Sequence, residues 1–382
     1  MTNPNARPAV GVYIHWPYCA RICPYCDFAV VRDRGKKAEQ AALVDAIAAD
    51  LTAQAAMLGE RRLVSIFLGG GTPSLMDPEA AGRLIALCRS VWPGADEIEI
   101  TLEANPTDAE ADRFAAFAAA GVNRLSLGVQ ALDDASLAFL GRNHGADEAR
   151  RAATLGGKLF RRLSLDFIYA LPGQTLAGWR DTLNAAAALG AEHISPYQLT
   201  IEAGTAFDRA VRRGAFAPAD PDLAAALYDE TQDALEALGF DAYEVSNHAR
   251  GEAARSRHNL IYWRGEDYLG VGPAAHGRLT FDGERVATET PRGIADYIAH
   301  VAKGGDGLAV RDVLDPRARA EERLLMGLRT YEGVSRTELA ALSLARMAEL
   351  VDAGMIVADA ANLRATPAGR LLLDRVTQML AE

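Results

Sequence analysis

Three cysteines lie within eight residues near the start of the sequence. Cys19, Cys23 and Cys26 follow a C-x3-C-x2-C spacing in the stretch CARICPYCDF. Thiolates held this close together repel one another unless a metal binds them, so the spacing predicts a metal site. The remaining cysteine, Cys88, lies in the helical pattern LIALCRSVW and is expected to be a buried core thiol.

Two kinds of metal site fit this group of cysteines. One is a zinc site of three cysteines and one histidine, which the sequence allows because His15 precedes Cys19 by four residues. The other is an iron–sulfur cluster with three protein ligands, which leaves one iron open for a non-protein ligand. Pro17, Pro24 and the flanking aromatic residues suit a loop around one face of a bulky cluster, so the sequence favours the iron–sulfur site.

The elements that must position these cysteines alternate along the first two hundred residues. Short β-rich runs predict strands at 10–16, 63–71, 97–106, 122–130, 162–172 and 192–200, and Ala/Leu-rich stretches predict helices at 36–58, 77–91, 108–120, 133–156 and 175–190. Strands separated by helices in this way indicate repeated βα units and a parallel sheet. Six units predict an α/β fold with a partial (β/α)6 TIM-like barrel, since a closed barrel of this kind has eight.

Polar residues stand in or directly after almost every predicted strand. GGGTP follows the second strand, Glu103 and Asn105 end the third, Gln130 ends the fourth and Asp166 lies in the fifth. Parallel βα folds build their sites at the carboxyl edge of the sheet, so we expect these residues to meet there.

The regular alternation of predicted strands and helices ends after about residue 205. Helices are expected around 222–238 and 294–302, on either side of the polar and aromatic segment 256–278. From about 317 the runs EERLLMGLRT, SRTELAAL, SLARMAELVDAG and GRLLLDRVTQML predict helices, and MIVAD and LRATP predict a small strand pair. We therefore expect a core domain at 1–240, a connecting segment at 241–315 and a small winged-helix-like domain at 316–382.

Composition limits the class of protein. A net charge of −11 over 382 residues argues against binding nucleic acid through bulk electrostatics. Four cysteines, three of them together, indicate a reducing compartment and not a disulfide framework. The first thirty residues lack an apolar signal core, which predicts a cytoplasmic protein and leaves peripheral membrane contact open.

The cysteine spacing after a first strand, with GGGTP after the second, resembles the radical S-adenosylmethionine superfamily. The resemblance implies that Cys19, Cys23 and Cys26 hold a [4Fe–4S] cluster, with S-adenosylmethionine on the open iron. Carried over motif by motif, it also implies that eight residues surround S-adenosylmethionine: Tyr13, Gly70, Gly71, Thr72, Glu103, Gln130, Arg142 and Asp166. Backbone amides, carboxylates and a guanidinium suit a ligand that carries an ammonium, a carboxylate and ribose hydroxyls.

Within the superfamily, GVYIHWPYC, LEANP, LSLGVQALDD, LGRNH and LDFIYALPGQT resemble oxygen-independent coproporphyrinogen III dehydrogenases and the HemW-type heme chaperones. The dehydrogenases typically carry a further cysteine two residues after the third, where this chain has Phe28. HNLIYW at 258–263 is similar to the H-N-x-x-Y-W motif that the chaperones use for heme, which implies that His258 binds heme.

The resemblance therefore favours a heme chaperone that passes heme to respiratory heme proteins. Homodimer formation is a further family expectation. The alternative is a dehydrogenase that oxidatively decarboxylates the propionates of coproporphyrinogen III, so the sequence leaves open whether the chain is an enzyme. Radical chemistry on an unrelated substrate is a third hypothesis.

Overall fold

The computed structural model describes residues 7–93 and 97–382. Its centre is a row of six parallel strands that neighbour one another in chain order. They are β1 (Ala9–Trp16), β4 (Arg62–Gly70), β5 (Glu99–Ala104), β6 (Arg124–Gln130), β7 (Arg162–Tyr169) and β8 (His193–Gln198). Each lies within three residues of a predicted strand at either end, so the six-unit α/β core is confirmed.

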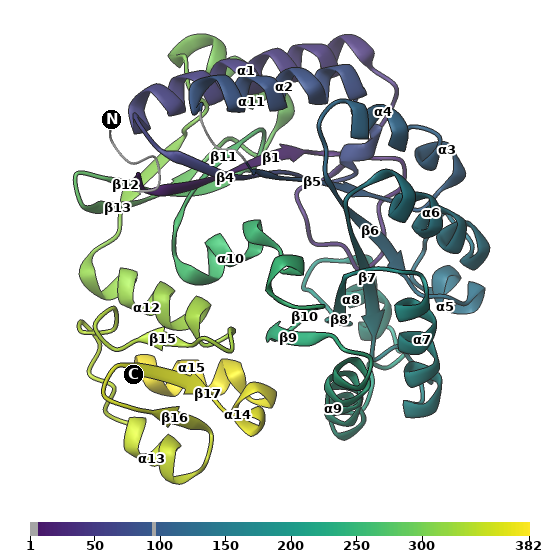
Figure 1. Ribbon diagram of the computed structural model, residues 1–382, viewed down its shortest axis with the longest axis vertical. Helices are drawn as coiled ribbons and strands as arrows, with labels where there is room; N and C mark the ends of the chain where they lie inside the picture. The colour runs from purple at the N-terminus through teal and green to yellow at the C-terminus, as the bar shows by residue number, and fades with distance from the viewer. Residues whose placement is uncertain (1–6, 94–96) are drawn as a thin grey trace.

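The sheet is extended beyond this row and stays open (Figure 1). On the β1 edge it gains β11 (Asp267–Val271), β12 (His276–Phe281), β13 (Glu284–Glu289) and β14 (Val310–Val313), and on the β8 edge it gains β10 (Asn247–Ala249) and β9 (Asp241–Glu244). Because β14 and β9 end the sheet without pairing to each other, the barrel is partial, as predicted.

The segment expected to connect two domains thus supplies strands to the main sheet. β11 runs parallel to β1, whereas β12, β13 and β14 follow as antiparallel neighbours. The domain boundaries remain a prediction.

Most helices cover the outer face of the curved sheet, and α10 lies on its concave side (Figure 1). The helices of the main sheet are α1 (Lys37–Leu58), α2 (Pro78–Val91), α3 (Asp108–Ala111), α4 (Phe114–Ala119), α5 (Asp134–Phe139), α6 (Ala146–Leu159), α7 (Leu176–Ala188), α8 (Ala206–Arg212), α9 (Pro221–Ala237), α10 (Arg257–Arg264) and α11 (Ile294–Gly304). α10 packs against β1, β4 and β11. By length and composition α1 could cross a membrane, but 50% of its apolar window is buried, as in a core helix.

Two predicted helices are divided. The helix expected at 108–120 is split into α3 and α4 around Arg113, whose guanidinium donates to the carbonyls of Ser74 and Met76. The helix expected at 133–156 is split into α5 and α6, because Gly141 takes a left-handed conformation with φ of 66°. Arg142 follows this glycine and therefore lies in the turn between α5 and α6.

The C-terminal part has its own apolar core. It contains α12 (Pro316–Gly327), β15 (Val334–Ser335), α13 (Met347–Asp352), β16 (Ile356–Ala358), β17 (Asn362–Ala365), α14 (Pro367–Leu371) and α15 (Leu373–Ala381). The helix expected from SRTELAAL is wrong: residues 336–342 form turns. The backbone there is already engaged, since β15 pairs with β17 and the Arg336 amide donates to the Ala361 carbonyl at 2.8 Å.

Candidate functional site

The cysteines lie on a loop that leaves the end of β1. Two short parallel strands, β2 (Tyr18–Cys19) and β3 (Val31–Arg32), close the base of the loop. The Asp33 amide donates to the Cys19 carbonyl at 2.8 Å, and within the loop the Cys26 amide donates to the Cys23 carbonyl at 3.2 Å. The three thiols are therefore carried by one closed loop at the carboxyl edge of the sheet.

The glycine-rich turn after β4 packs directly on the start of this loop. The Gly71 amide donates to the Trp16 carbonyl at 2.7 Å, and the Thr72 amide donates to the Tyr18 carbonyl at 2.8 Å. A Cβ on Gly71 would lie 2.7 Å from the Tyr18 carbonyl oxygen, so only glycine fits this approach. Gly70 has φ of 107°, a conformation that also favours glycine.

A cavity of about 370 Å³ lies between the cysteine loop and the strand ends. The three cysteines line it together with seven of the eight residues that were predicted to surround S-adenosylmethionine: Gly70, Gly71, Thr72, Glu103, Gln130, Arg142 and Asp166. These residues come from the ends of β4, β5 and β6, from within β7 and from the α5–α6 turn. The structure thus brings together in space residues that are spread over almost 150 positions of the chain.

Arg142 connects the cysteine loop to the strand ends. Its Nη1 donates to Cys23 Sγ at 3.3 Å and to the Tyr25 hydroxyl at 3.4 Å, and its Nη2 donates to the Gly128 carbonyl at 3.0 Å. Nη2 also donates to the Asn105 side chain. The Nε atom is buried without a partner among the described residues, so the guanidinium retains one donor for a bound ligand.

Two half-buried carboxyl groups face the same cavity. Glu103 accepts a hydrogen bond from the Gly70 amide at 3.1 Å, and Asp166 accepts one from the Ser126 hydroxyl at 3.0 Å. Burial, and then the nearby Asp166, raise the pKa of Glu103 to about 8. Burial also raises the pKa of Asp166. A cationic ligand such as an ammonium group would favour the ionised carboxylates and so lower the free-energy cost of placing two acids side by side.

Gln130 ends β6 in a strained conformation. Its φ is 66°, which is uncommon for a residue other than glycine and is often found at functional sites. Ser126 and Gly128 line the cavity from the same strand. The sequence reasoning missed these two, although the alternation of side chains along a strand places 126, 128 and 130 on one face. It also missed Tyr197 of β8, whose sequence neighbours give no comparable signal.

Tyr13 and His258 do not line the cysteine cavity. Tyr13 lies in β1, where its hydroxyl and His15 Nδ1 are 3.0 Å apart. His258 lies in the first turn of α10 and is 1% exposed. Its Nδ1 is 2.7 Å from the Ser65 hydroxyl and its Nε2 is 2.6 Å from the Tyr262 hydroxyl, so both ring nitrogens are engaged inside the protein.

A second cavity, of about 440 Å³, adjoins the first. The two share Asp27, Phe28, Gly70 and Glu103 as lining residues. Tyr13 lines this second cavity, and so does Tyr262 from the HNLIYW segment. His258 therefore lies behind the wall of the second cavity and contacts it through Tyr262. Its expected role as a direct heme ligand remains a prediction that the contacts of its ring do not support.

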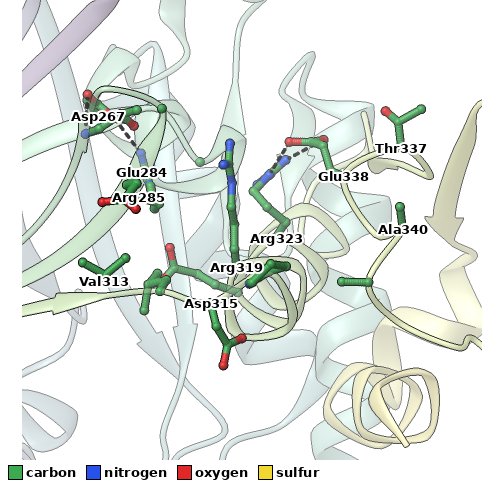
Figure 2. Close-up of a pocket in the computed structure, with 17 residues that line it drawn as sticks. Asp267, Glu284, Arg285, Val313, Asp315, Arg319, Arg323, Thr337, Glu338 and Ala340 are labelled. Atoms are coloured by element: carbon green, nitrogen blue, oxygen red, sulfur yellow. Dashed lines mark hydrogen bonds and ion pairs between the residues drawn. The ribbon is translucent and has the colours of Figure 1, made fainter.

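A larger cavity, of about 690 Å³, lies between the β11–β14 region and the C-terminal part. Two of its arginines are held in ion pairs: Arg285 pairs with Asp267 at 2.6 Å and Arg323 pairs with Glu338 at 2.7 Å (Figure 2). None of the three clustered cysteines lines it. We therefore assign the chemistry to the cavity at the cysteine loop.

The side chains available as metal ligands at the cysteine loop fit an iron–sulfur cluster better than a zinc ion. His15, the fourth ligand that a zinc site would need, is already held: its Nε2 is 3.0 Å from the Ala29 carbonyl and its Nδ1 is 3.0 Å from the Tyr13 hydroxyl. Among the described residues, no three histidine, cysteine or acidic side chains converge as a single-ion site. Three thiols spread around one cavity, with the unsatisfied Nε of Arg142 in the same wall, suit a larger group that also carries a ligand.

Comparisons with known proteins show which family the chain resembles. Residues 13–186 match the radical SAM superfamily, and residues 314–372 match the HemN C-terminal domain. The heme chaperone HemW of Escherichia coli is 40% identical over 75% of this chain and 75% of its own length, and that of Bacillus subtilis is 34% identical over 86% of each. The mitochondrial radical S-adenosyl methionine domain-containing protein 1 of Bos taurus is 38% identical over 98% of this chain and 88% of its own length.

Among solved structures, coproporphyrinogen III oxidase (HemN) from Escherichia coli superposes with a TM-score of 0.81 over 99% of this chain and 91% of that chain. At 21% identity this likeness concerns the fold. Fold and site together define a radical S-adenosylmethionine protein with a HemN-type C-terminal domain. Within that superfamily, the chain belongs to the HemW family. Membership of the superfamily implies a [4Fe–4S] cluster and S-adenosylmethionine. Cys19, Cys23 and Cys26, which were predicted to hold the cluster, line one cavity and would hold it there.

Proposed function

We propose that this chain is a heme chaperone, which binds heme beside its cysteine cavity and passes it to respiratory heme proteins. The observation that carries the proposal is the position of HNLIYW. Its Tyr262 lines a cavity of about 440 Å³ that shares Phe28 and Gly70 with the cysteine cavity. A cavity of this size and aromatic character suits a flat cofactor-sized ligand.

Two further features support a carrier. Relatives that are 34–40% identical are named heme chaperones. Phe28 occupies the position where the dehydrogenases typically have a fourth cysteine, and its side chain is 64% exposed between the two cavities. An exposed aromatic ring there offers a stacking surface to a porphyrin. The respiratory acceptor, membrane contact and dimer formation rest on the family alone and stay predictions.

An anaerobic heme titration tests the carrier. The reconstituted protein should develop a saturable Soret band, and His258→Ala should weaken it, since loss of the imidazole removes the partner that fixes Tyr262. His248→Ala is the matched control, because that histidine is equally buried but lies on β10, away from both cavities. Equal heme binding by wild type and His258→Ala would show that His258 has no role in the heme site.

The alternative function is oxygen-independent coproporphyrinogen III dehydrogenase, favoured by the fold shared with HemN. When bound, the cluster and S-adenosylmethionine would supply the oxidising radical for that reaction. The proposal predicts that reconstituted protein given coproporphyrinogen III, S-adenosylmethionine and a reductant forms no protoporphyrinogen. Sustained turnover of the porphyrinogen would refute the chaperone assignment in favour of the enzyme.

A further inference from the structure

Heme iron in a carrier needs an accessible axial ligand, and histidine is the commonest one. All seven histidines of the chain lie in its described part. Five of them are buried: His15, His144, His193, His248 and His258. His300 is half-buried on α11, at the outer face of the sheet, and lines neither the cysteine cavity nor the adjoining one. His276 alone is both exposed and in the wall of the cavity beside the cysteine loop.

We propose that His276, and not His258, supplies the axial imidazole to heme iron in the cavity of about 440 Å³ that adjoins the cysteine loop. This inference rests on the proposed heme-carrier function and assigns its iron ligand. His258 then acts as a positioning residue, through its contact with Tyr262.

The ring of His276 is free to bind a metal. Its side chain is 59% exposed, and Nε2 makes no hydrogen bond within the described part of the chain. Nδ1 lies 3.6 Å from Glu289 Oε1, the residue directly opposite on the neighbouring strand. A carboxylate on the Nδ1 side of the ring leaves Nε2 as the nitrogen that can face a metal.

The backbone around His276 is built to bring this residue to the end of β1. A Cβ on Gly270 would lie 2.1 Å from the His276 carbonyl oxygen, and a Cβ on Gly272 would lie 2.4 Å from the His15 carbonyl oxygen. Gly272 also has φ of 99°. The glycines of LGVGPAAHG thus permit a close crossing that places His276 at the rim of the cavity.

The remaining walls suit a porphyrin. Tyr262 and Tyr268 both line the cavity and contact each other edge to face, with ring centroids 4.5 Å apart. Phe28 adds an exposed ring from the cysteine loop. Arg292 lines the same cavity without a side-chain partner among the described residues, so its guanidinium can pair with a propionate.

Other side chains in this cavity are poorer ligands. Both nitrogens of His15 are held by Tyr13 and Ala29. Burial raises the pKa of Tyr13 and of Tyr262, so their phenols stay protonated near neutral pH and do not offer a phenolate to iron.

The test is an anaerobic heme titration of His276→Ala, followed by resonance Raman or magnetic circular dichroism of the bound heme. Loss of a ligand should weaken heme affinity roughly tenfold or more and remove the iron–imidazole signature, because even residues that only support a ligand cost about that much. Imidazole added to His276→Ala should restore the signature. His300→Ala, the control with a histidine away from the cavity, should bind heme as the wild type does.

Two variants separate this inference from the proposed function. In His258→Ala the affinity should fall while the iron–imidazole signature of the remaining complex stays unchanged. In Glu289→Gln the iron–histidine vibration should shift while heme still binds. Failure of the wild type to bind heme would overturn the proposed function itself. Normal binding with an unchanged axial signature in His276→Ala would overturn the assignment of His276 alone.

Discussion

Glu103 and Asp166 are two acids in one cavity, which Arg142 also lines, and the charge of the buried Arg124 acts on both of them. A carboxyl group whose pKa is raised by folding binds its proton more tightly in the folded state than in the unfolded state. The stability that it contributes is therefore complete at acidic pH and is lost as the pH rises from about 4.5 towards about 8, where Glu103 ionises in the folded protein.

We expect Glu103→Gln to flatten this pH dependence in the metal-free protein. At pH 8.5 the variant should be more stable than the wild type by roughly 1–3 kcal/mol, because the amide removes a half-buried charge, and the difference should shrink at pH 5.5. Urea denaturation at both pH values measures it. Glu97→Gln, which changes an exposed acid, should follow the wild type; an unchanged pH slope in Glu103→Gln would show that the carboxyl is not buried as described.

The three cysteines of the loop differ from Cys88 in their surroundings. Cys19, Cys23 and Cys26 line one cavity, whereas Cys88 is completely buried in α2 among apolar side chains. Burial raises the pKa of Cys88 to about 12, which suits an inert core thiol.

Single replacement of any of the loop cysteines by serine should abolish the iron–sulfur absorbance near neutral pH. Cys88→Ala should keep the full absorbance and iron content, and lose only the stability that a small core cavity costs, about 1 kcal/mol. Iron and sulfide analysis of anaerobically reconstituted protein measures the effect. If a loop variant retained a full cluster, the replaced cysteine would not be one of the cluster ligands.

At the scale of elements, the site is the meeting point of the cysteine loop and the glycine turn after β4. Gly71→Ala should push the turn away from the Tyr18 carbonyl and so lower both the free energy of unfolding, by about 1–3 kcal/mol, and the cluster content. Thermal denaturation and iron analysis check both. Gly157→Ala on α6 is the matched control, since its Cβ would meet nothing closer than 3.8 Å. Equal losses in the two variants would contradict the close approach at Gly71.

The order of strands and the strand-end residues could be predicted because both follow from local patterns. Apolar runs of strand length, separated by helical stretches, identify β1 and β4 to β8, and topology alone then brings Glu103, Gln130 and Asp166 to one edge. Arg142 could be assigned by motif only. Its place depends on Gly141, which breaks a stretch whose composition favours one continuous helix.

Long-range packing explains what the sequence did not predict. His258 looks like a ligand in the sequence, but α10 lies inside the curve of the sheet, so Ser65 of β4 engages its ring from a distance of 193 positions along the chain. The turns at 336–342 likewise follow from the pairing of β15 with β17. Neither contact leaves a periodic signal in the local sequence.

At the scale of the whole molecule, the C-terminal part braces the helix that carries HNLIYW. α12 packs on α10, Arg323 donates to the Trp263 carbonyl at 2.8 Å, and Arg264 pairs with Glu332 at 2.6 Å. The HemN-type domain therefore holds one wall of the proposed heme cavity through α10. The cysteine loop and the sheet edge form walls of the two adjoining cavities, and the C-terminal domain supports one of these walls through α10.

Transfer of heme tests the carrier function most directly. Reconstituted protein loaded with one equivalent of heme should be mixed anaerobically with an apo-heme protein, and the Soret band of the acceptor should be followed while mass spectrometry identifies the porphyrin. The account predicts that the acceptor gains intact heme as this chain loses it, faster than it does from free heme at the same concentration. Heme that stays on this chain, or a porphyrin altered in mass, would contradict the account.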